Sequence, residues 1–220
     1  MSKTTNNYFI KNSYVANLAP LTLDENSGGI YWDKGRIKAS YIYQFPVYRY
    51  LLDIAKENNS KTVMDIGCGV ASKLAYMHDQ QPSLNFIGVD QPNAIDYCNS
   101  VYSFGTWITD NFEKPSGVIK TVATPDLIVC SDVIEHLQDP NILLQYIKGA
   151  SKPETLIIIS TPNRDRLRGE SCNNCENKHH IREWNDAEFA KYITSQGFTI
   201  IEQFHQSPIK ISLNRFLYSE

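Results

Sequence analysis

The chain has 220 residues, of which 42% are hydrophobic and 20% charged, and its formal net charge is −3. This length and composition predict one globular domain of ordinary size. The net charge excludes the strongly basic surface needed to bind nucleic acid or an anionic membrane. No apolar run approaches the roughly 20 residues that span a bilayer, and the N-terminus lacks a signal-peptide core. The odd count of five cysteines favours reduced thiols, so we expect a cytoplasmic protein.

Residues 1–60 are rich in Tyr and Asn and carry a crowded group of aromatic residues ahead of the apolar stretch 51–55. We expect one or two helices here, forming an N-terminal cap or substrate lid. Residues 61–220 are expected to form the main domain, without a clear linker between the two. The alternative is that the aromatic side chains of this region simply pack on the core.

From residue 61 onward, short apolar runs alternate with helix-like segments. The runs end at Asp65, at Asp90, near Ile108, at Cys130 and at Ser160, with helices expected at 71–79, 92–100, 139–149 and 186–196. Continuous apolar runs are typical of strands covered on both faces, so they predict a parallel sheet with crossover helices. Two more strands, at 198–204 and 209–217, should pair antiparallel because their connection is short. The predicted fold is a Rossmann-like α/β domain with a seven-stranded, mostly parallel sheet, helices on both faces and an N-terminal helical extension.

The run 62–69, Thr-Val-Met-Asp-Ile-Gly-Cys-Gly, carries a strand directly into a Gly-x-Gly turn. Glycine lets the backbone approach a ligand closely, and a strand, a glycine turn and a helix are the layout of a nucleotide-binding unit. A dinucleotide-binding turn has a third glycine where this chain has Ser72, and Asp65 would set a negative charge beside the pyrophosphate. Asp65 instead suits a ligand with a cationic amino group and a sulfonium, such as S-adenosylmethionine.

Asp90, Asp110 and the pair Cys130-Ser131 follow the next strands of the sequence. The carboxyl ends of parallel strands meet at one edge of a sheet, so these residues should lie near one another. Together with the glycine turn they resemble the motifs of class I S-adenosylmethionine-dependent methyltransferases over roughly residues 60–205. That resemblance implies that Asp90 binds the ribose and that Asp110 lies at the adenine. The cofactor-binding residues that it implies are Asp65, Gly67, Cys68, Gly69, Asp90, Gln91, Asp110, Asn111 and Ser131.

The segment 131–137, Ser-Asp-Val-Ile-Glu-His-Leu, places three ligand-type side chains just after the fourth strand. If it opens a short helix, Asp132, Glu135 and His136 lie at i, i+3 and i+4 on one face, beside the methyl donor. Such a face suits general acid/base catalysis or a divalent metal ion. With His180 ahead of a Glu-Trp pair, the chain resembles ubiquinone-pathway O-methyltransferases, small-RNA 3′-terminal 2′-O-methyltransferases and methyltransferases of polysaccharide gene clusters.

The resemblance to the small-RNA enzymes implies a metal (Mg²⁺, Mn²⁺ or Zn²⁺) held by Asp132, Glu135, His136 and His180. Asp132 departs from that pattern, since those enzymes have a glutamate there. The first alternative is a metal-free O- or N-methyltransferase in which His136 or His180 is the general base. The predicted catalytic residues are His136, His180 and Glu135. The acidic balance argues against RNA as the substrate, so we expect O-methylation of a small polar or glycan acceptor. The second alternative is a non-catalytic partner subunit that only binds the cofactor.

The loop before His180 carries two cysteines and three arginines. Cys172 and Cys175 form a Cys-x-x-Cys pair, which could bind zinc together with the nearby histidines. The alternative is a flexible substrate loop with incidental thiols, because the two ligand pairs of a zinc site are normally separated by a longer spacer. The three arginines could bind a phosphate or carboxylate on the acceptor. The alternative is an ordinary solvated loop. They are Arg164, Arg166 and Arg168. The identity of the acceptor and the oligomeric state stay open at this point.

Overall fold

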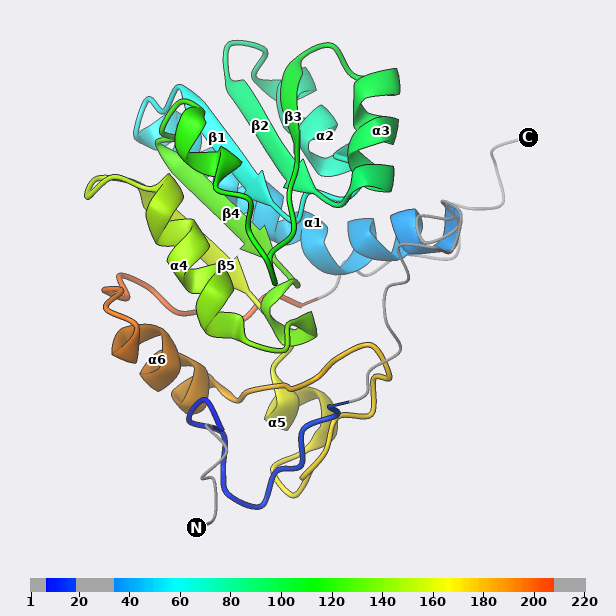
Figure 1. Ribbon diagram of the computed structural model, residues 1–220, viewed down its shortest axis with the longest axis vertical. Helices are drawn as coiled ribbons and strands as arrows, with labels where there is room; N and C mark the ends of the chain where they lie inside the picture. Colours follow the sequence, from blue (N-terminus) through cyan, green and yellow to red (C-terminus); the bar gives the residue numbers. More distant parts are fainter. Residues whose placement is uncertain (1–6, 19–33, 208–220) are drawn as a thin grey trace.

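A parallel sheet forms the centre of the computed structural model, which describes residues 7–18 and 34–207 (Figure 1). Within these residues the sheet has five strands in the order β3-β2-β1-β4-β5. They are β1 (Thr62–Ile66), β2 (Asn85–Asp90), β3 (Gly105–Thr109), β4 (Leu127–Ser131) and β5 (Leu156–Ser160). The strand order reverses between β1 and β4, and open α/β sheets bind their ligands beyond the carboxyl ends of the strands at such a point.

Helices connect the strands and cover both faces of the sheet (Figure 1). The four helices expected from the sequence are α2 (Ser72–Gln80), α3 (Pro92–Val101), α4 (Pro140–Ala150) and α6 (Asp186–Ser195). A long helix α1 (Lys34–Glu57), a short helix α5 (Arg164–Arg168) and the 3₁₀ turns η2 (Val118–Thr121) and η3 (Ile134–His136) complete the elements. Local sequence sets several ends: Asp139 caps α4, and Asn185 with Glu188 forms a capping box on α6.

The core consists of two apolar clusters, one on each face of the sheet. Successive side chains of a strand point to opposite faces, so Val63 of β1 belongs to one cluster and Met64 to the other. The Val63 cluster also contains Tyr48 and Leu51, which are buried side chains of α1. Part of the first sixty residues is therefore built into the same core as the sheet.

The sheet is smaller than the sequence predicted. Residues 198–204 form no strand, and Ile201 in this segment is 82% exposed, so the strand predicted there is wrong. An apolar pattern becomes a strand only when a neighbouring strand supplies hydrogen bonds, and the described residues supply none here. The other expected strand, at 209–217, lies outside the described residues.

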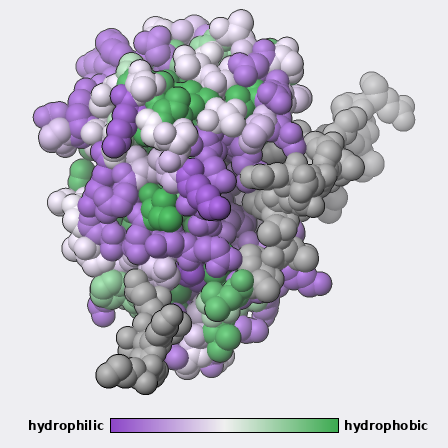
Figure 2. Space-filling view, viewed as in Figure 1, coloured by the Kyte–Doolittle hydropathy of each residue, from purple (hydrophilic) through white to green (hydrophobic). Residues whose placement is uncertain are grey.

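The described helices, the exposed side chains and the cysteines have the following properties. None of the helices in the described ranges combines the length and the apolar character needed to cross a membrane. Figure 2 shows that hydrophilic side chains dominate this face of the molecule and that apolar residues lie in small separate patches. Single exposed apolar residues are normal for folded proteins. All five cysteines are free, and Cys68, Cys98 and Cys130 are buried.

Candidate active site

The turn after β1 adopts a conformation that glycine favours. Gly67 and Gly69 have φ angles of 89° and 55°, in the left-handed region. A Cβ on Gly67 would lie 2.3 Å from Cγ2 of Val133, which follows β4. The absence of a side chain at Gly67 therefore lets the two segments at the reversal of strand order pack together.

Asp65 lies beneath this turn and is completely buried. Its Oδ2 accepts a 2.8 Å hydrogen bond from the Tyr48 hydroxyl of α1, whereas its Oδ1 has no hydrogen-bond partner among the described residues. Burial raises the pKa of Asp65 to about 7, against the opposing effects of the Lys73 charge and the Tyr48 hydrogen bond. A buried carboxylate oxygen without a donor is costly, so this atom marks a position that a bound cation would complete.

Asp90 at the end of β2 faces the same turn. Its two carboxylate oxygens accept 2.7 Å hydrogen bonds from the amides of Gly69 and Gln91. Burial raises the pKa of Asp90 in spite of these bonds. A carboxylate oxygen can accept more than one hydrogen bond, so Asp90 retains capacity for ligand hydroxyls. The thiol of Cys68, by contrast, points into the core, where it donates to the Gly69 carbonyl.

Asp110, after β3, is held by its own loop and by α4. Its Oδ1 accepts from the amides of Asn111 and Ser116, and its Oδ2 accepts a 2.9 Å hydrogen bond from the Tyr146 hydroxyl. The Asn111 side chain caps the turn that follows. These bonds shape the loop after β3, and a contact of Asp110 or Asn111 with adenine stays a prediction.

Asp132 ties α1 to the ends of β4 and β5. It has a left-handed φ of 55°. Its Oδ2 accepts from Nε2 of Gln44 at 3.1 Å, and its Oδ1 accepts from the Ser160 hydroxyl at 3.4 Å. Ser160 also shares a 2.7 Å hydrogen bond with the hydroxyl of Ser131. Burial raises the pKa of Asp132.

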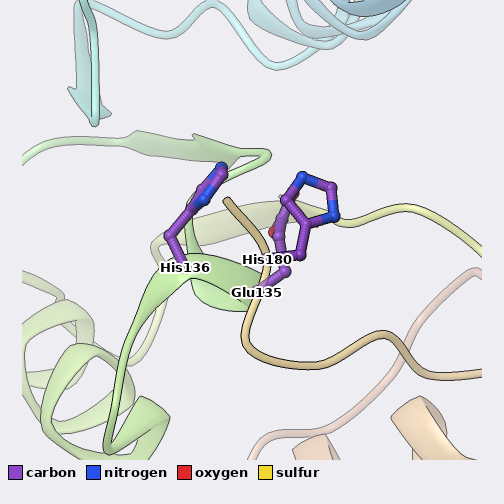
Figure 3. A group of neighbouring side chains, drawn as sticks. All are labelled: Glu135, His136 and His180. Carbon is purple, nitrogen blue, oxygen red and sulfur yellow. The ribbon is translucent and has the colours of Figure 1, made fainter. Parts of the chain in front are cut away.

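Glu135, His136 and His180 form a compact group of metal-ligand-type side chains (Figure 3). Glu135 and His136 lie on η3, whereas His180 comes from the loop before α6. One potential ligand atom from each residue lies within 4.8 Å of the other two, and the two rings meet edge to face with centroids 4.7 Å apart. The group does not include Asp132. The structure thus brings together three of the four residues that the sequence suggested as metal ligands.

Hydrogen bonds between two distant segments place His180 beside His136. The amide of Ile181 donates to the Glu135 carbonyl at 2.8 Å. The Arg182 guanidinium donates to the carbonyls of Leu137 and Gln138 at 2.6 and 3.0 Å. The loop before α6 is therefore fastened to η3 from both its backbone and its side chains.

Replacing Arg182 with methionine should lower the free energy of unfolding by about 2 kcal/mol, because two carbonyls would lose a charged donor. Arg182 is only 4% exposed, and its guanidinium carbon lies 4.5 Å from the centroid of the Tyr8 ring. Urea unfolding followed by circular dichroism measures the change. The exposed Arg166 is the control, and Arg166→Met should change stability by less than about 0.5 kcal/mol. Equal stabilities of the two variants would contradict this role of Arg182.

The orientation of both histidine rings is fixed through Nδ1. Nδ1 of His136 bonds the carbonyl oxygen of His179 at 2.8 Å, and since a carbonyl only accepts, this nitrogen carries the proton. Nδ1 of His180 bonds Oε1 of Glu183 at 2.7 Å. Burial opposes ionisation of Glu183, but its bonds to Arg168 and His180 lower its pKa to about 2. Each ring therefore has Nε2 as its basic nitrogen; in His180 this atom lies 2.9 Å from the side-chain nitrogen of Asn177.

Glu135 supplies a buried carboxylate oxygen to the group. Its Oε2 accepts from the Thr161 hydroxyl at 3.0 Å, and its Oε1 is buried with no partner among the described residues. Burial raises the pKa of Glu135 well above its usual range. Histidines oriented through Nδ1 by a carbonyl or carboxylate, next to an oxygen ligand, are typical of metal sites. The group also suits proton transfer without a metal.

The three arginines predicted to lie in a loop belong to helix α5, and two of them form ion pairs. Arg164 is fully buried and bonds both carboxylate oxygens of Glu188 at 2.7 and 3.1 Å. Arg168 pairs with Glu183 at 2.7 Å. The interpretation of these two arginines as binders of an acceptor anion is therefore wrong, and Arg166 alone of the three is exposed.

The loop cysteines do not form a joint site in the structure. Cys175 lies in a second ligand-type group with His180 and Glu183, and Cys172 does not belong to it. Burial raises the pKa of Cys175 to about 12. The zinc interpretation of the Cys-x-x-Cys pair gains no support from this geometry.

Sequence reasoning missed several residues that contact the site. Gln44 and Tyr48 lie four residues apart on α1, so they share one helix face, but nothing in the aromatic cluster singled them out. Glu183 follows His180 at i+3, a spacing that could have been noticed. Lys73 carried no motif, and only the fold shows that it is buried next to Tyr48.

The methyltransferase domain family matches residues 40–203 of the chain. The chain is 26% identical over 108 residues to the ubiquinone biosynthesis O-methyltransferase of Colwellia psychrerythraea. The matched stretch covers 46% of this chain and 42% of that protein. It is 25% identical over 126 residues to the enzyme of the same name from Paraburkholderia phymatum, with coverages of 54% and 52%. The chain thus matches about half the length of these curated relatives.

Solved structures share the fold at low sequence identity. A chain in the complex of the Haloferax volcanii Trm112 methyltransferase activator with a methyltransferase has 15% identity and a TM-score of 0.62, covering 85% of this chain and 84% of that chain. The methyltransferase domain of bacterial CtHen1-C has 20% identity and a TM-score of 0.54, with coverages of 70% and 82%. The chain therefore belongs to the methyltransferase domain family and has the fold of the class I S-adenosylmethionine-dependent methyltransferases.

Proposed function

We propose that the protein transfers the methyl group of S-adenosylmethionine to an oxygen atom of a small polar or glycan acceptor. The observation that carries this proposal is the close grouping of the side chains of Glu135, His136 and His180. Val133, two residues before Glu135, packs against Gly67, and this contact supports a position of the group near the turn. The O-methyltransferase names of the curated relatives support oxygen as the acceptor atom.

The cofactor would occupy the crevice between the turn and the ends of β2 and β3. Asp65 would accept from its ammonium through Oδ1, and Asp90 would accept from its ribose hydroxyls. The Gly67–Gly69 backbone would lie against the cofactor without interference from side chains. Methyl transfer then depends mainly on placing the acceptor oxygen in line with the sulfonium and removing its proton. Residues 1–60 would cap this crevice, since Gln44 and Tyr48 of α1 donate hydrogen bonds to Asp132 and Asp65.

Glu135, His136 and His180 would hold a divalent ion through one carboxylate oxygen and two Nε2 atoms. Such an ion, when bound, lowers the pKa of an acceptor hydroxyl. The protein supplies the orientation: the His179 carbonyl holds His136, and Glu183 holds His180. Asn177 would have to release Nε2 of His180. The unpartnered Oε1 of Glu135 is the observation that favours this use of the group.

A metal-free reaction at the same group is the second candidate. Because Nδ1 of His136 donates to a carbonyl, its Nε2 is the unprotonated nitrogen and can accept the proton of the acceptor. The carboxylate of Glu135 would stabilise the imidazolium formed in this step. The partner-subunit alternative predicts cofactor binding without turnover.

Chelation and metal titration separate these candidates. We expect methyl transfer on a panel of sugars and phenols to stop after exhaustive chelation and to return with Mg²⁺, Mn²⁺ or Zn²⁺. Calorimetric titration with Mn²⁺ gives a second readout, in which His180→Ala should weaken binding at least about tenfold. His179→Ala keeps the backbone carbonyl that holds His136 and should leave Mn²⁺ binding unchanged. Full turnover after chelation would reject the metal, and a failure to bind S-adenosylhomocysteine would reject the proposed function.

A further inference from the structure

Cys175, His180 and Glu183 form a second group of metal-ligand-type side chains, on the loop before α6. One potential ligand atom from each of them lies within 4.8 Å of the other two. His180 also belongs to the group with Glu135 and His136 that Figure 3 shows. His180 and Glu183 are buried, whereas Cys175 is half-buried. The second group differs from the first in offering a sulfur ligand and in coming from one short stretch of chain.

A hydrogen bond occupies the position between His180 and Glu183 that an ion could take. Nδ1 of His180 lies 2.7 Å from Oε1 of Glu183. Arg168 donates to both oxygens of the same carboxylate, from Nε to Oε2 at 2.7 Å and from Nη2 to Oε1 at 2.9 Å. Because each carboxylate oxygen accepts more than one bond, the Arg168 pair can stay in place when an ion replaces the proton on Nδ1. A Cys175 thiolate would offset the added positive charge beside Arg168.

We propose that Cys175, His180 and Glu183 bind a zinc ion through Sγ, Nδ1 and a carboxylate oxygen, and that this ion withdraws His180 from the first group. Thiolate, imidazole and carboxylate are the ligands of zinc, whereas Mg²⁺ and Mn²⁺ prefer oxygen. The ligand atoms of a tetrahedral zinc site lie roughly 3.5 Å apart, so the side chains have to shift by about an ångström. On binding, the thiol releases its proton to solvent and the Nδ1 proton of His180 moves to Nε2.

The shared histidine couples the two groups. A neutral imidazole has one unprotonated nitrogen. With zinc on Nδ1, Nε2 of His180 carries the proton, so it can neither bind an ion beside Glu135 nor accept a proton from the acceptor. Zinc in the second group should therefore inhibit methyl transfer. This inhibition rests on the proposed function, whereas zinc binding itself does not.

Cobalt absorption tests the site without any methyl transfer, because Co²⁺ replaces zinc and gives a thiolate-to-metal charge-transfer band when a cysteine binds it. We expect this band in the wild type and its loss in Cys175→Ser. Cys172→Ser is the matched control, since its thiol bonds the Asn174 carbonyl outside the group, and it should keep the band. His136→Ala should also keep it, because His136 belongs only to the first group. Competition with zinc should give an affinity at least about tenfold weaker in Cys175→Ser.

Initial rates with Mn²⁺ present give the second readout. Zinc should inhibit the wild type and Cys172→Ser, and Cys175→Ser should keep the basal rate but need at least about tenfold more zinc for the same inhibition. Equal inhibition of Cys175→Ser would overturn the coupling, because zinc would then act by displacing Mn²⁺ from the first group. A wild type without the thiolate band, or a band that persists in Cys175→Ser, would overturn the site. A wild type that shows the band but methylates no acceptor would reject the proposed function and leave the zinc site established.

Discussion

Glu135→Gln should lower kcat/KM for methyl transfer by about a thousandfold and weaken Mn²⁺ binding by at least about a hundredfold, while the fold stays as stable as the wild type. The Glu135 side chain is fully buried, and burial raises its pKa well above the usual range. The isosteric amide can still accept from Thr161, but it lacks the charge that a metal ion or a His136 imidazolium needs. Because burial already disfavours the charged form of Glu135, the neutral amide should not destabilise the protein, and the melting temperature should stay equal or rise.

The control for this variant is Glu176→Gln. Glu176 is 67% exposed and pairs with Arg168 at the surface, so its loss should leave the rate and the Mn²⁺ affinity unchanged. Initial rates, calorimetric titration with Mn²⁺ and thermal unfolding are measured on both variants. Normal Mn²⁺ binding and normal turnover in Glu135→Gln would show that this carboxylate has no part in the chemistry.

The sheet and its helices could be predicted because their signals are local. Continuous apolar runs such as the one in β4 are typical of strands covered on both faces, and β4 is buried along its whole length. Proline and capping residues mark the first turns of α3, α4 and α6. The strand expected at 198–204 failed because an apolar pattern does not reveal whether another strand is available for pairing.

The site could be predicted only where its residues are neighbours in sequence. Glu135 and His136 share one short turn, whereas His180 was reached through a family resemblance. In a helical backbone Asp132 would lie on the same face as Glu135 and His136. Its φ of 55° is not helical, and its carboxylate bonds Gln44 and Ser160 instead. The burial of Lys73 beside Tyr48 depends on how α1 packs against α2, which no local pattern specifies.

Asp65→Asn should weaken the binding of S-adenosylhomocysteine by roughly a hundredfold at about pH 8 and should abolish the pH dependence of that binding. In the free protein the pKa of Asp65 is about 7, so at neutral pH a large share of the molecules holds a protonated acid. A ligand ammonium binds the ionised form, so the wild-type affinity should rise as the pH increases from about 6 and level off above about 7.5. Asparagine cannot ionise, yet its carbonyl oxygen can still accept from Tyr48, so the fold should be retained.

The opposite end of the sheet offers the control for Asp65→Asn. Asp126 precedes β4, and hydrogen bonds from the Lys61 and Thr62 amides, together with Lys152, lower its pKa. It is therefore ionised over the whole range, and Asp126→Asn should keep both the affinity and the pH profile of the wild type. Calorimetric titrations at several pH values distinguish the variants. A wild-type affinity that is flat over this range, or a slope that persists in Asp65→Asn, would mean that the methionine ammonium is not held by the carboxylate at the end of β1.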